Sequence, residues 1–173
     1  MTEILTVNAL AIEKAVATLR AGGIVALPTE TVYGLAADAT NGMAVAKVFA
    51  AKGRPGFNPL ICHVASMDMA RALGEFDPLS QKLARHFWPG PLTLVVPQKE
   101  SSRIHPLVCA GLPTLALRMP EGVVSEIITL LGHPLAAPSA NSSGKISATT
   151  AKAVADDLGA VVPLVLDGGP SLV

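Results

Sequence analysis

Short apolar runs alternate with capped helical patterns along the whole chain, and this alternation limits the folds that it can adopt. Strands are predicted at 24–28, 60–64 and 114–120, and within TETVYGLAAD, WPGPLTLVVP, PLAAPSAN and VVPLVLDGG. Helices are predicted from Asn8 onward, over 43–52, from Ser66 to Gly74, over 77–87, in GVVSEIITLLG and over 147–159. This order favours an α/β or α+β sheet with helical cover. Pro163, inside the last apolar run, predicts a sheet edge or a bulge there.

Composition restricts what such a sheet can do. The 173 residues suit one domain, and 50% are hydrophobic but only 3% aromatic, so aliphatic side chains and alanine must fill the core. Lys and Arg together number 13, as do Asp and Glu. A protein that coats nucleic acid usually carries an overall basic charge. Any anion site in this chain is therefore expected to be local.

The cysteines and the N-terminus predict a cytoplasmic protein. Cys62 and Cys109 have no CxxC or zinc-like spacing and are interpreted as reduced, partly buried thiols. The first residues carry acids and no basic n-region, unlike a signal peptide. No apolar run reaches ~18 residues, so no membrane span is expected.

The segment KGRPGFNPL, residues 52–60, places two cations among glycines and prolines. Such a stretch predicts a stiff, exposed loop that follows a helix ending near Gly53. Lys52 and Arg54 there suit a phosphate group. A solvated loop with incidental charges is the other interpretation, and neither a P-loop nor GxGxxG is present.

Short polar side chains follow two other predicted strands. Ser139 and Asn141 flank an alanine after an apolar run, where they suit either a ligand or an ordinary turn or helix cap. Thr29 and Thr31 alternate with Glu30, so both threonines are expected on one side of an extended segment. Ordinary β-propensity explains the threonines equally well.

Arg118 stands in an apolar strand and needs an anion, which is either a structural ion-pair partner or a ligand carboxylate. His63 also lies in an apolar strand, where a histidine is usually a core or rim residue. The four histidines have no metal-ligand spacing, and HFWPGPLT, residues 86–93, is interpreted as a packing corner around the single tryptophan. No Ser-His-Asp order, paired catalytic carboxylates or HExxH motif favours a hydrolase.

Five blocks occur together in one order: PTETVYGLAADA, KGRPGFNPLICHV, WPGPLTLVV, LALRMP and PSANSSGKISATT. In these blocks the chain, from about residue 10 to 170, resembles the YrdC/Sua5 family, the threonylcarbamoyl-AMP synthases. The resemblance implies a twisted mixed α/β sheet of the YrdC/RibB-like (DHBP synthase-like) type, with an open, positively lined cavity. It also implies that L-threonine, bicarbonate and ATP are joined into threonylcarbamoyl-adenylate, with release of pyrophosphate.

Site residues follow from the same resemblance. The ATP-binding positions it implies are Lys52, Arg54, Asn58, Thr114, Asn141 and Thr149. The threonine-binding positions are Thr31, His63, Arg118 and Ser139, with Arg118 suited to the carboxylate. Lys52 and Arg54 of the KxR element face Ser139 and Asn141 of the SxN element, and these four form the catalytic set. Mg²⁺ is expected with ATP, and no protein side chain is expected to ligate a metal.

The resemblance also suggests partners and extent. The product serves the threonylcarbamoyl modification of adenosine 37 in tRNA, so tRNA and the downstream transfer machinery are expected partners. An alternative is a double-stranded RNA- or ribosome-binding protein without synthase activity. A third possibility is a carbamoyl-transfer module of a larger protein. Residues 1–173 are expected to form one domain that ends, at LDGGPSLV, before the family's GxxSTV-type element and lacks the Sua5-type C-terminal domain.

Overall fold

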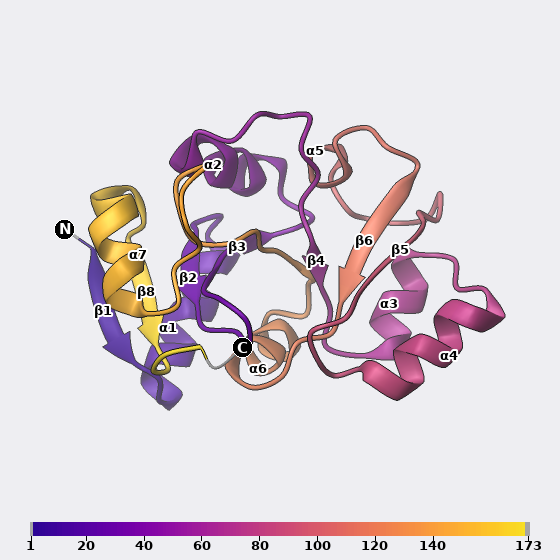
Figure 1. The fold of residues 1–173 in the computed structure, drawn as a ribbon, viewed down its shortest axis with the longest axis horizontal. Coiled ribbons are helices and arrows are strands. Elements are labelled where there is room, and N and C mark those ends of the chain that lie inside the picture. The colour runs from indigo at the N-terminus through magenta and orange to yellow at the C-terminus, as the bar shows by residue number, and fades with distance from the viewer. Residues whose placement is uncertain (1, 172–173) are drawn as a thin grey trace.

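Eight strands form one mixed sheet in residues 2–171, the part of the chain that the computed structural model describes. The order from one edge to the other is β1-β8-β2-β3-β7-β4-β6-β5; all of these strands except β7 are labelled in Figure 1, where they follow one another from left to right. The strands are β1 (Glu3–Thr6), β2 (Val25–Leu27), β3 (Gly34–Asp38), β4 (Cys62–His63), β5 (Thr93–Pro97), β6 (Thr114–Arg118), β7 (Leu135–Ala136) and β8 (Leu164–Asp167). Parallel pairs join β1 to β8, β8 to β2, and β4 to β6, and the other pairs are antiparallel. The predicted α/β class with a mixed sheet is confirmed.

Local capping signals set the helix starts. The helices are α1 (Ala9–Arg20), α2 (Gly42–Lys52), α3 (Met67–Leu73), α4 (Pro78–Phe87), α5 (Pro106–Cys109), α6 (Val123–Leu131) and α7 (Ala151–Leu158), and a 3-10 turn follows at Gly159–Val161. The predicted caps Asn8, Ser66 and Asp77 each accept a backbone amide through the side chain. Gly53 ends α2 with φ +58°, a left-handed conformation that favours glycine.

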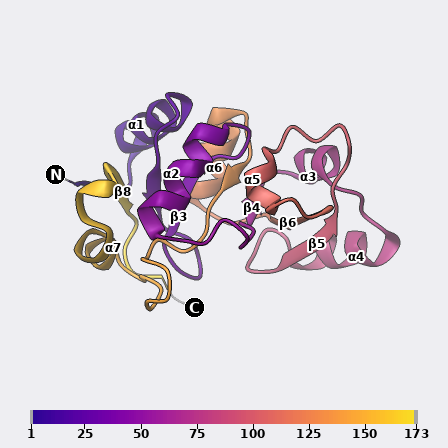
Figure 2. The ribbon, with the colours of Figure 1, turned by 90° about the horizontal axis from the view of Figure 1, so that it is seen from above.

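Two clusters of buried residues place helices on both faces of the sheet. Figure 2 shows the molecule from above, with α1 and α7 on either side of β8. On one face, α1 and α6 pack on side chains such as Val25 and Leu164. On the other face, α2, α3, α4 and α7 pack on their strand neighbours, among them Ala26 and Val165. Neighbouring residues of one strand thus serve opposite cores, as the two-residue period of a strand requires.

Several sequence predictions need correction. The strands predicted at 60–64 and in PLAAPSAN shrink to Cys62–His63 and Leu135–Ala136, because the chain leaves the sheet at both places to form the site described below. The last helix begins at Ala151, after its cap Thr150, and not at 147. Both β1 and α5 escaped prediction. The predicted edge or bulge at Pro163 is wrong, because β8 lies between β1 and β2. Pro163 comes just before the strand, and its carbonyl accepts a hydrogen bond from Glu3 N–H.

Other interpretations are confirmed. Cys62 and Cys109 are free and buried, and burial raises the pKa of the Cys62 thiol. Trp88 forms a packing corner: its indole N–H donates to the Leu92 carbonyl at 2.7 Å, and its ring meets Phe76 edge-on at 6.1 Å. Among residues 2–171, none of the helices is long and apolar enough to cross a membrane.

Candidate active site

A cavity of about 280 Å³ opens where the chain leaves the middle of the sheet. Its lining comes from the segment between β2 and β3, the loop before β4, and the ends of β4, β6 and β7. The lining residues are Thr29, Thr31, Val32, Gly34, Arg54, Pro59, Ile61, His63, Arg118, Ala137, Pro138 and Ser139. All four residues predicted to bind threonine, Thr31, His63, Arg118 and Ser139, are therefore brought to one cavity.

The cationic centre of this cavity is Arg118, the last residue of β6. Its side chain is 9% exposed and forms an ion pair with Glu30 through Nη2. Both Nη1 and Nη2 lie 3.3 Å from Thr31 Oγ1, and Nε donates to the Gly90 carbonyl. The sequence left open whether Arg118 pairs with a structural partner or with a ligand carboxylate, and the structural partner is present.

The segment from Thr29 to Val32 is an irregular turn rather than a strand. Thr29 Oγ1 lies 3.1 Å from Thr31 Oγ1 and donates to the Val32 carbonyl at 2.6 Å. The prediction that the two threonines share one side is confirmed. Because the backbone is irregular, the intervening Glu30 still reaches Arg118.

His63 is a buried imidazole at the cavity wall. Burial lowers its pKa to about 3, with a further contribution from the Arg118 charge, while a hydrogen bond to the Leu135 backbone opposes the shift. Its Nδ1 has no hydrogen-bond partner among the described residues. The imidazole is therefore neutral at physiological pH, and it offers the cavity a polar nitrogen without a charge.

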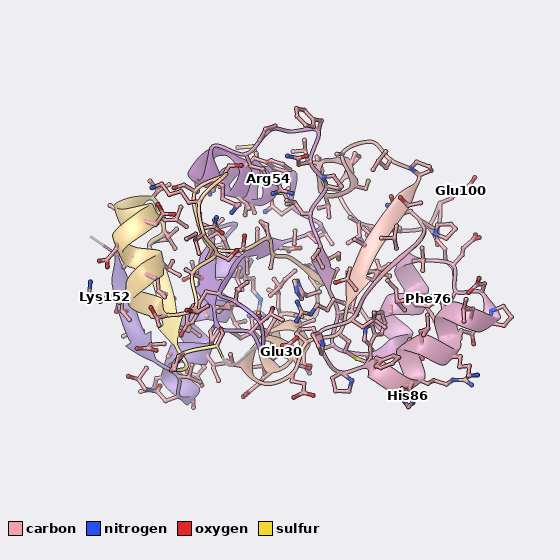
Figure 3. All side chains as sticks on the ribbon, viewed as in Figure 1. Glu30, Arg54, Phe76, His86, Glu100 and Lys152 are labelled. Carbon is pink, nitrogen blue, oxygen red and sulfur yellow. The ribbon has the colours of Figure 1, made fainter. Side chains whose placement is uncertain are left out.

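Arg54 follows the helix stop and lies at the upper rim in Figure 3. Its guanidinium donates to the Asn58 carbonyl at 3.3 Å and to the Pro59 carbonyl at 3.0 Å, and partial burial lowers its pKa. No carboxylate pairs with it among the described ion pairs. Its positive charge is available to an anion in the cavity.

Lys52 is not in an exposed loop, contrary to the prediction. It ends α2 with 3% of its surface exposed, and its Nζ donates to the carbonyls of Ser139, at 2.5 Å, and of Asn141. Ser143 N–H in turn donates to the Lys52 carbonyl at 2.7 Å. Burial, followed by the nearby Arg54 charge, lowers the lysine pKa to about 8. Lys52 thus ties α2 to the segment 139–143.

A second, more open cavity of about 620 Å³ lies beyond this segment. Asn141 and Thr149 both line it, together with Lys145, Ile146 and Asp157. The Asn141 amide nitrogen donates to the carbonyls of Ser142 and Lys145, whereas its Oδ1 is buried and has no hydrogen-bond partner within residues 2–171. Ser139 thus borders the first cavity and Asn141 the second.

Besides the buried Lys52, two predicted positions line neither cavity. Asn58 is half-buried in the turn after Arg54, where its backbone N–H donates to the Pro55 carbonyl at 3.1 Å. Thr114 begins β6 and pairs with Pro97. It shares a sheet face with Arg118, but the two residues are four positions apart along the strand, about 13 Å.

Sequence reasoning missed Glu30 as the partner of Arg118 and Asp157 as an anchor of the second cavity. Asp157 accepts Ser142 N–H at 2.6 Å and Lys145 Nζ at 2.5 Å. The position of Glu30 between two threonines was a sequence signal for a site residue. The assumed alternation of a strand, however, placed its side chain on the side opposite to Thr29 and Thr31. For Asp157, on a helix distant in sequence, no local signal exists.

The arrangement suits a small zwitterion beside a larger anion. Arg118 can pair with a carboxylate, Thr31 and Ser139 supply hydroxyls, and Ile61, Val32 and Ala137 supply apolar contact. Arg54 and the second cavity provide charge and volume for a phosphorylated ligand. Among residues 2–171, no group of three or more His, Cys, Asp or Glu side chains could hold a metal ion.

Comparison with known proteins agrees with this geometry. The Sua5/YciO/YrdC family model, described as telomere recombination, matches residues 17–173. The threonylcarbamoyl-AMP synthase of Bacillus subtilis is 46% identical over 173 residues, covering 99% of this chain and 50% of the relative. That of Pyrococcus abyssi is 47% identical over 153 residues, covering 87% of this chain and 44% of the relative.

Solved structures show the same similarity. The P. abyssi Sua5 structure complexed with L-threonine superposes with a TM-score of 0.93 at 44% identity, covering 98% of this chain and 51% of that one. Escherichia coli YciO, at 19% identity and a TM-score of 0.88, shows the shared fold. The chain spans about half the length of the two curated relatives named above.

Proposed function

The chain belongs to the Sua5/YciO/YrdC family, and on that premise we propose that it is a threonylcarbamoyl-AMP synthase. It joins L-threonine, bicarbonate and ATP into L-threonylcarbamoyladenylate and pyrophosphate. The product is an activated carbamoyl donor, and its consumer is the machinery that modifies adenosine 37 of tRNA. The proposed location of this reaction in the cell is the cytoplasm.

One observation carries this proposal: Thr31, His63, Arg118 and Ser139 converge from four separate segments on one cavity. Arg118 binds the threonine carboxylate, since a guanidinium matches a carboxylate in shape and charge. The neighbouring hydroxyls and the His63 Nδ1 hydrogen-bond the remaining polar groups. A similar structure with L-threonine bound supports this assignment.

ATP occupies the adjacent second cavity, with its phosphates directed toward Arg54. Asn141 and Thr149 border that cavity, and Asn141 Oδ1, which has no partner in the described part of the chain, is an acceptor for the nucleotide. Lys52 supplies positive charge behind the segment 139–143, which it holds in place. Asn58 and Thr114 are assigned to the nucleotide by family resemblance alone.

ATP enters as its magnesium complex, and Mg²⁺ reduces the negative charge of the phosphates. The carboxylates beside the two cavities, Glu30 and Asp157, are already paired with Arg118 and Lys145, so the metal is held by the nucleotide. The cation that faces the phosphates is Arg54, while Lys52 adds its charge from behind the segment 139–143.

The chemistry needs little covalent help from the protein. The threonine amine attacks the carbon of bicarbonate, and water leaves as the carbamate forms. A carbamate oxygen then attacks the α-phosphorus of ATP, and the bond to pyrophosphate breaks. Both partners of the second step are anions, so Arg54 and Lys52 lower their repulsion and stabilise the charge that develops on pyrophosphate. Fixed positions of the two ligands supply the rest of the acceleration.

Pyrophosphate release tests the proposal. Release should require ATP, bicarbonate and threonine together, and Arg118→Gln should reduce it at least about tenfold because one charge-assisted contact is lost. Arg85→Gln, on the exposed face of α4, is the matched control and should retain full activity. Release that proceeds without threonine, or that survives Arg118→Gln unchanged, would contradict the assignment.

A further inference from the structure

Glu30 and Arg118 form a charged pair at the edge of the threonine cavity. Glu30 itself is 17% exposed through its side chain, and both of its neighbours, Thr29 and Thr31, line the cavity. Figure 3 shows Glu30 on the opposite side of the central region from Arg54. Arg118 of the pair lines the cavity and Glu30 lies directly beside it, between two lining residues.

Glu30 and Arg118 each have a hydrogen-bonding group that the pair does not use. Glu30 binds Arg118 through Oε1, while Oε2 is buried and has no hydrogen-bond partner among the described residues. The Arg118 guanidinium has five N–H groups. Its Nη1 makes one described contact, to Thr31, so a further Nη1 N–H remains for a ligand. A buried carboxylate oxygen without a donor is unfavourable, and a ligand donor would relieve the cost.

We propose that Glu30 recognises the α-ammonium group of the amino acid substrate. The carboxylate of the substrate takes the free side of Arg118, and the ammonium donates to Glu30 Oε2 as the amino acid binds. The nitrogen then loses one proton to solvent before it attacks bicarbonate. An α-amino acid carries these two charges on one carbon, so it matches a guanidinium and a carboxylate that are already in contact. This inference rests on the proposed function, because it assigns a group of the same substrate.

Charge explains why the ammonium matters. A ligand carboxylate on Arg118 lies close to Glu30, and two carboxylates that share one guanidinium repel each other. The ammonium cancels this repulsion, whereas a hydroxy acid without an amine does not. Glu30 therefore selects amino acids over simple carboxylates, and it is a specificity-determining residue.

Calorimetric titration of Glu30→Gln with two ligands tests the inference. The ligands are L-threonine and 3-hydroxybutanoate, which keeps the carboxylate and hydroxyl but lacks the amine. Threonine affinity should fall at least about tenfold, because an ion-paired hydrogen bond is lost. Affinity for 3-hydroxybutanoate should stay equal or rise, because the repulsion is removed. Glu100→Gln, an exposed glutamate that Figure 3 places far from Glu30, is the matched control and should change neither affinity.

The other outcomes are distinct. If Glu30 only fills the site until a ligand arrives, Glu30→Gln binds both ligands more tightly, which overturns the inference. Equal weakening for both ligands means that Glu30 only supports the fold, which also overturns it. If the unsubstituted protein binds no threonine, the proposed function itself fails. Thermal unfolding checks that Glu30→Gln is folded. If it is not, Glu30→Asp is used instead. In that variant the threonine affinity must fall by a larger factor than the affinity for 3-hydroxybutanoate.

Discussion

At the scale of single residues, the site combines one neutral imidazole and the paired Arg118 with two further cations of different accessibility. His63 is buried and unprotonated, Arg54 faces the cavity, and Lys52 is used internally. This division leaves the part of the cavity around His63 with few charges besides the Arg118–Glu30 pair. The behaviour of each residue can therefore be tested separately.

His63 should make stability depend on pH. Its folded pKa of about 3 lies below the unfolded value of 6.5, so the unfolded state binds more protons between these pH values. Stability contributed by neutral His63 is thus present above pH 6.5 and is lost as the pH falls. Between pH 7 and 5 the free energy of unfolding should fall by about 2 kcal/mol through this group. Urea unfolding at both pH values should show a correspondingly smaller drop in His63→Gln, and an identical drop would contradict the assignment.

Arg54→Ala should weaken MgATP binding. Loss of a charge-assisted contact to phosphate costs about 1.5–3 kcal/mol, or about 10- to 100-fold in affinity. Calorimetric titration measures the change, and Arg71→Ala, an exposed arginine on α3, serves as the control. Unchanged MgATP affinity in Arg54→Ala would remove this residue from the phosphate site.

Threonine should bind more tightly than serine because its methyl group packs against Ala137 and Ile61, which line the cavity. A single methyl in an apolar pocket provides about 1–3 kcal/mol, or about 10- to 200-fold. Competition of unlabelled serine against labelled threonine measures this ratio. Equal binding of the two amino acids would mean that the methyl group has no apolar contact in the cavity.

At the scale of elements, α2 and the segment 139–143 act as one unit. Lys52 donates to two carbonyls of that segment and accepts Ser143 N–H. The segment has no regular structure of its own, so its position depends on these bonds. Both cavities depend on it, since Ser139 borders one and Asn141 the other.

Lys52→Met should therefore destabilise the protein and loosen this segment. It leaves two carbonyls without their donor, which should lower the free energy of unfolding by about 2–5 kcal/mol. Hydrogen exchange of the Ser143 amide should accelerate as well. Lys82→Met, at an exposed position of α4, should change stability by less than about 0.5 kcal/mol. Equal stability of Lys52→Met and the unsubstituted protein would show that the lysine does not hold the segment.

At the scale of the whole molecule, one mixed sheet supports a site near its centre. The site lies where the antiparallel strands β3 and β7 meet β4, and α1 and α6 cover the opposite face of that region. Equal numbers of basic and acidic residues, 13 each, leave the positive charge of the site local. Such a molecule suits small charged ligands better than an extended polyanion.

Double-stranded RNA should accordingly bind weakly. Without an excess of cations, few phosphates are neutralised, and a dissociation constant no tighter than about 10⁻⁴ M is expected at physiological salt. Fluorescence anisotropy with a labelled RNA duplex measures it. Tight, salt-sensitive binding would instead favour the RNA-binding alternative.

Much of the fold and part of the site could be read from the sequence. Asn8, Ser66 and Asp77 cap helices as predicted, because a cap involves residues only a few positions apart. The threonine-binding set came from resemblance to a family, and all four members line one cavity. Its clustering was not deducible from spacing, because the members come from separate segments.

The sequence by itself determined the helix ends and the two-residue pattern of the strands, since these depend on interactions between near neighbours. Only the tertiary structure decided that β8 lies inside the sheet, that Lys52 is buried, and that Glu30 pairs with Arg118. Glu30 and Arg118 stand 88 residues apart in the chain, and Lys52 and Ser139 stand 87 apart. Such contacts follow from the packing of the whole sheet, which brings distant segments together and determines which polar groups must find partners away from water.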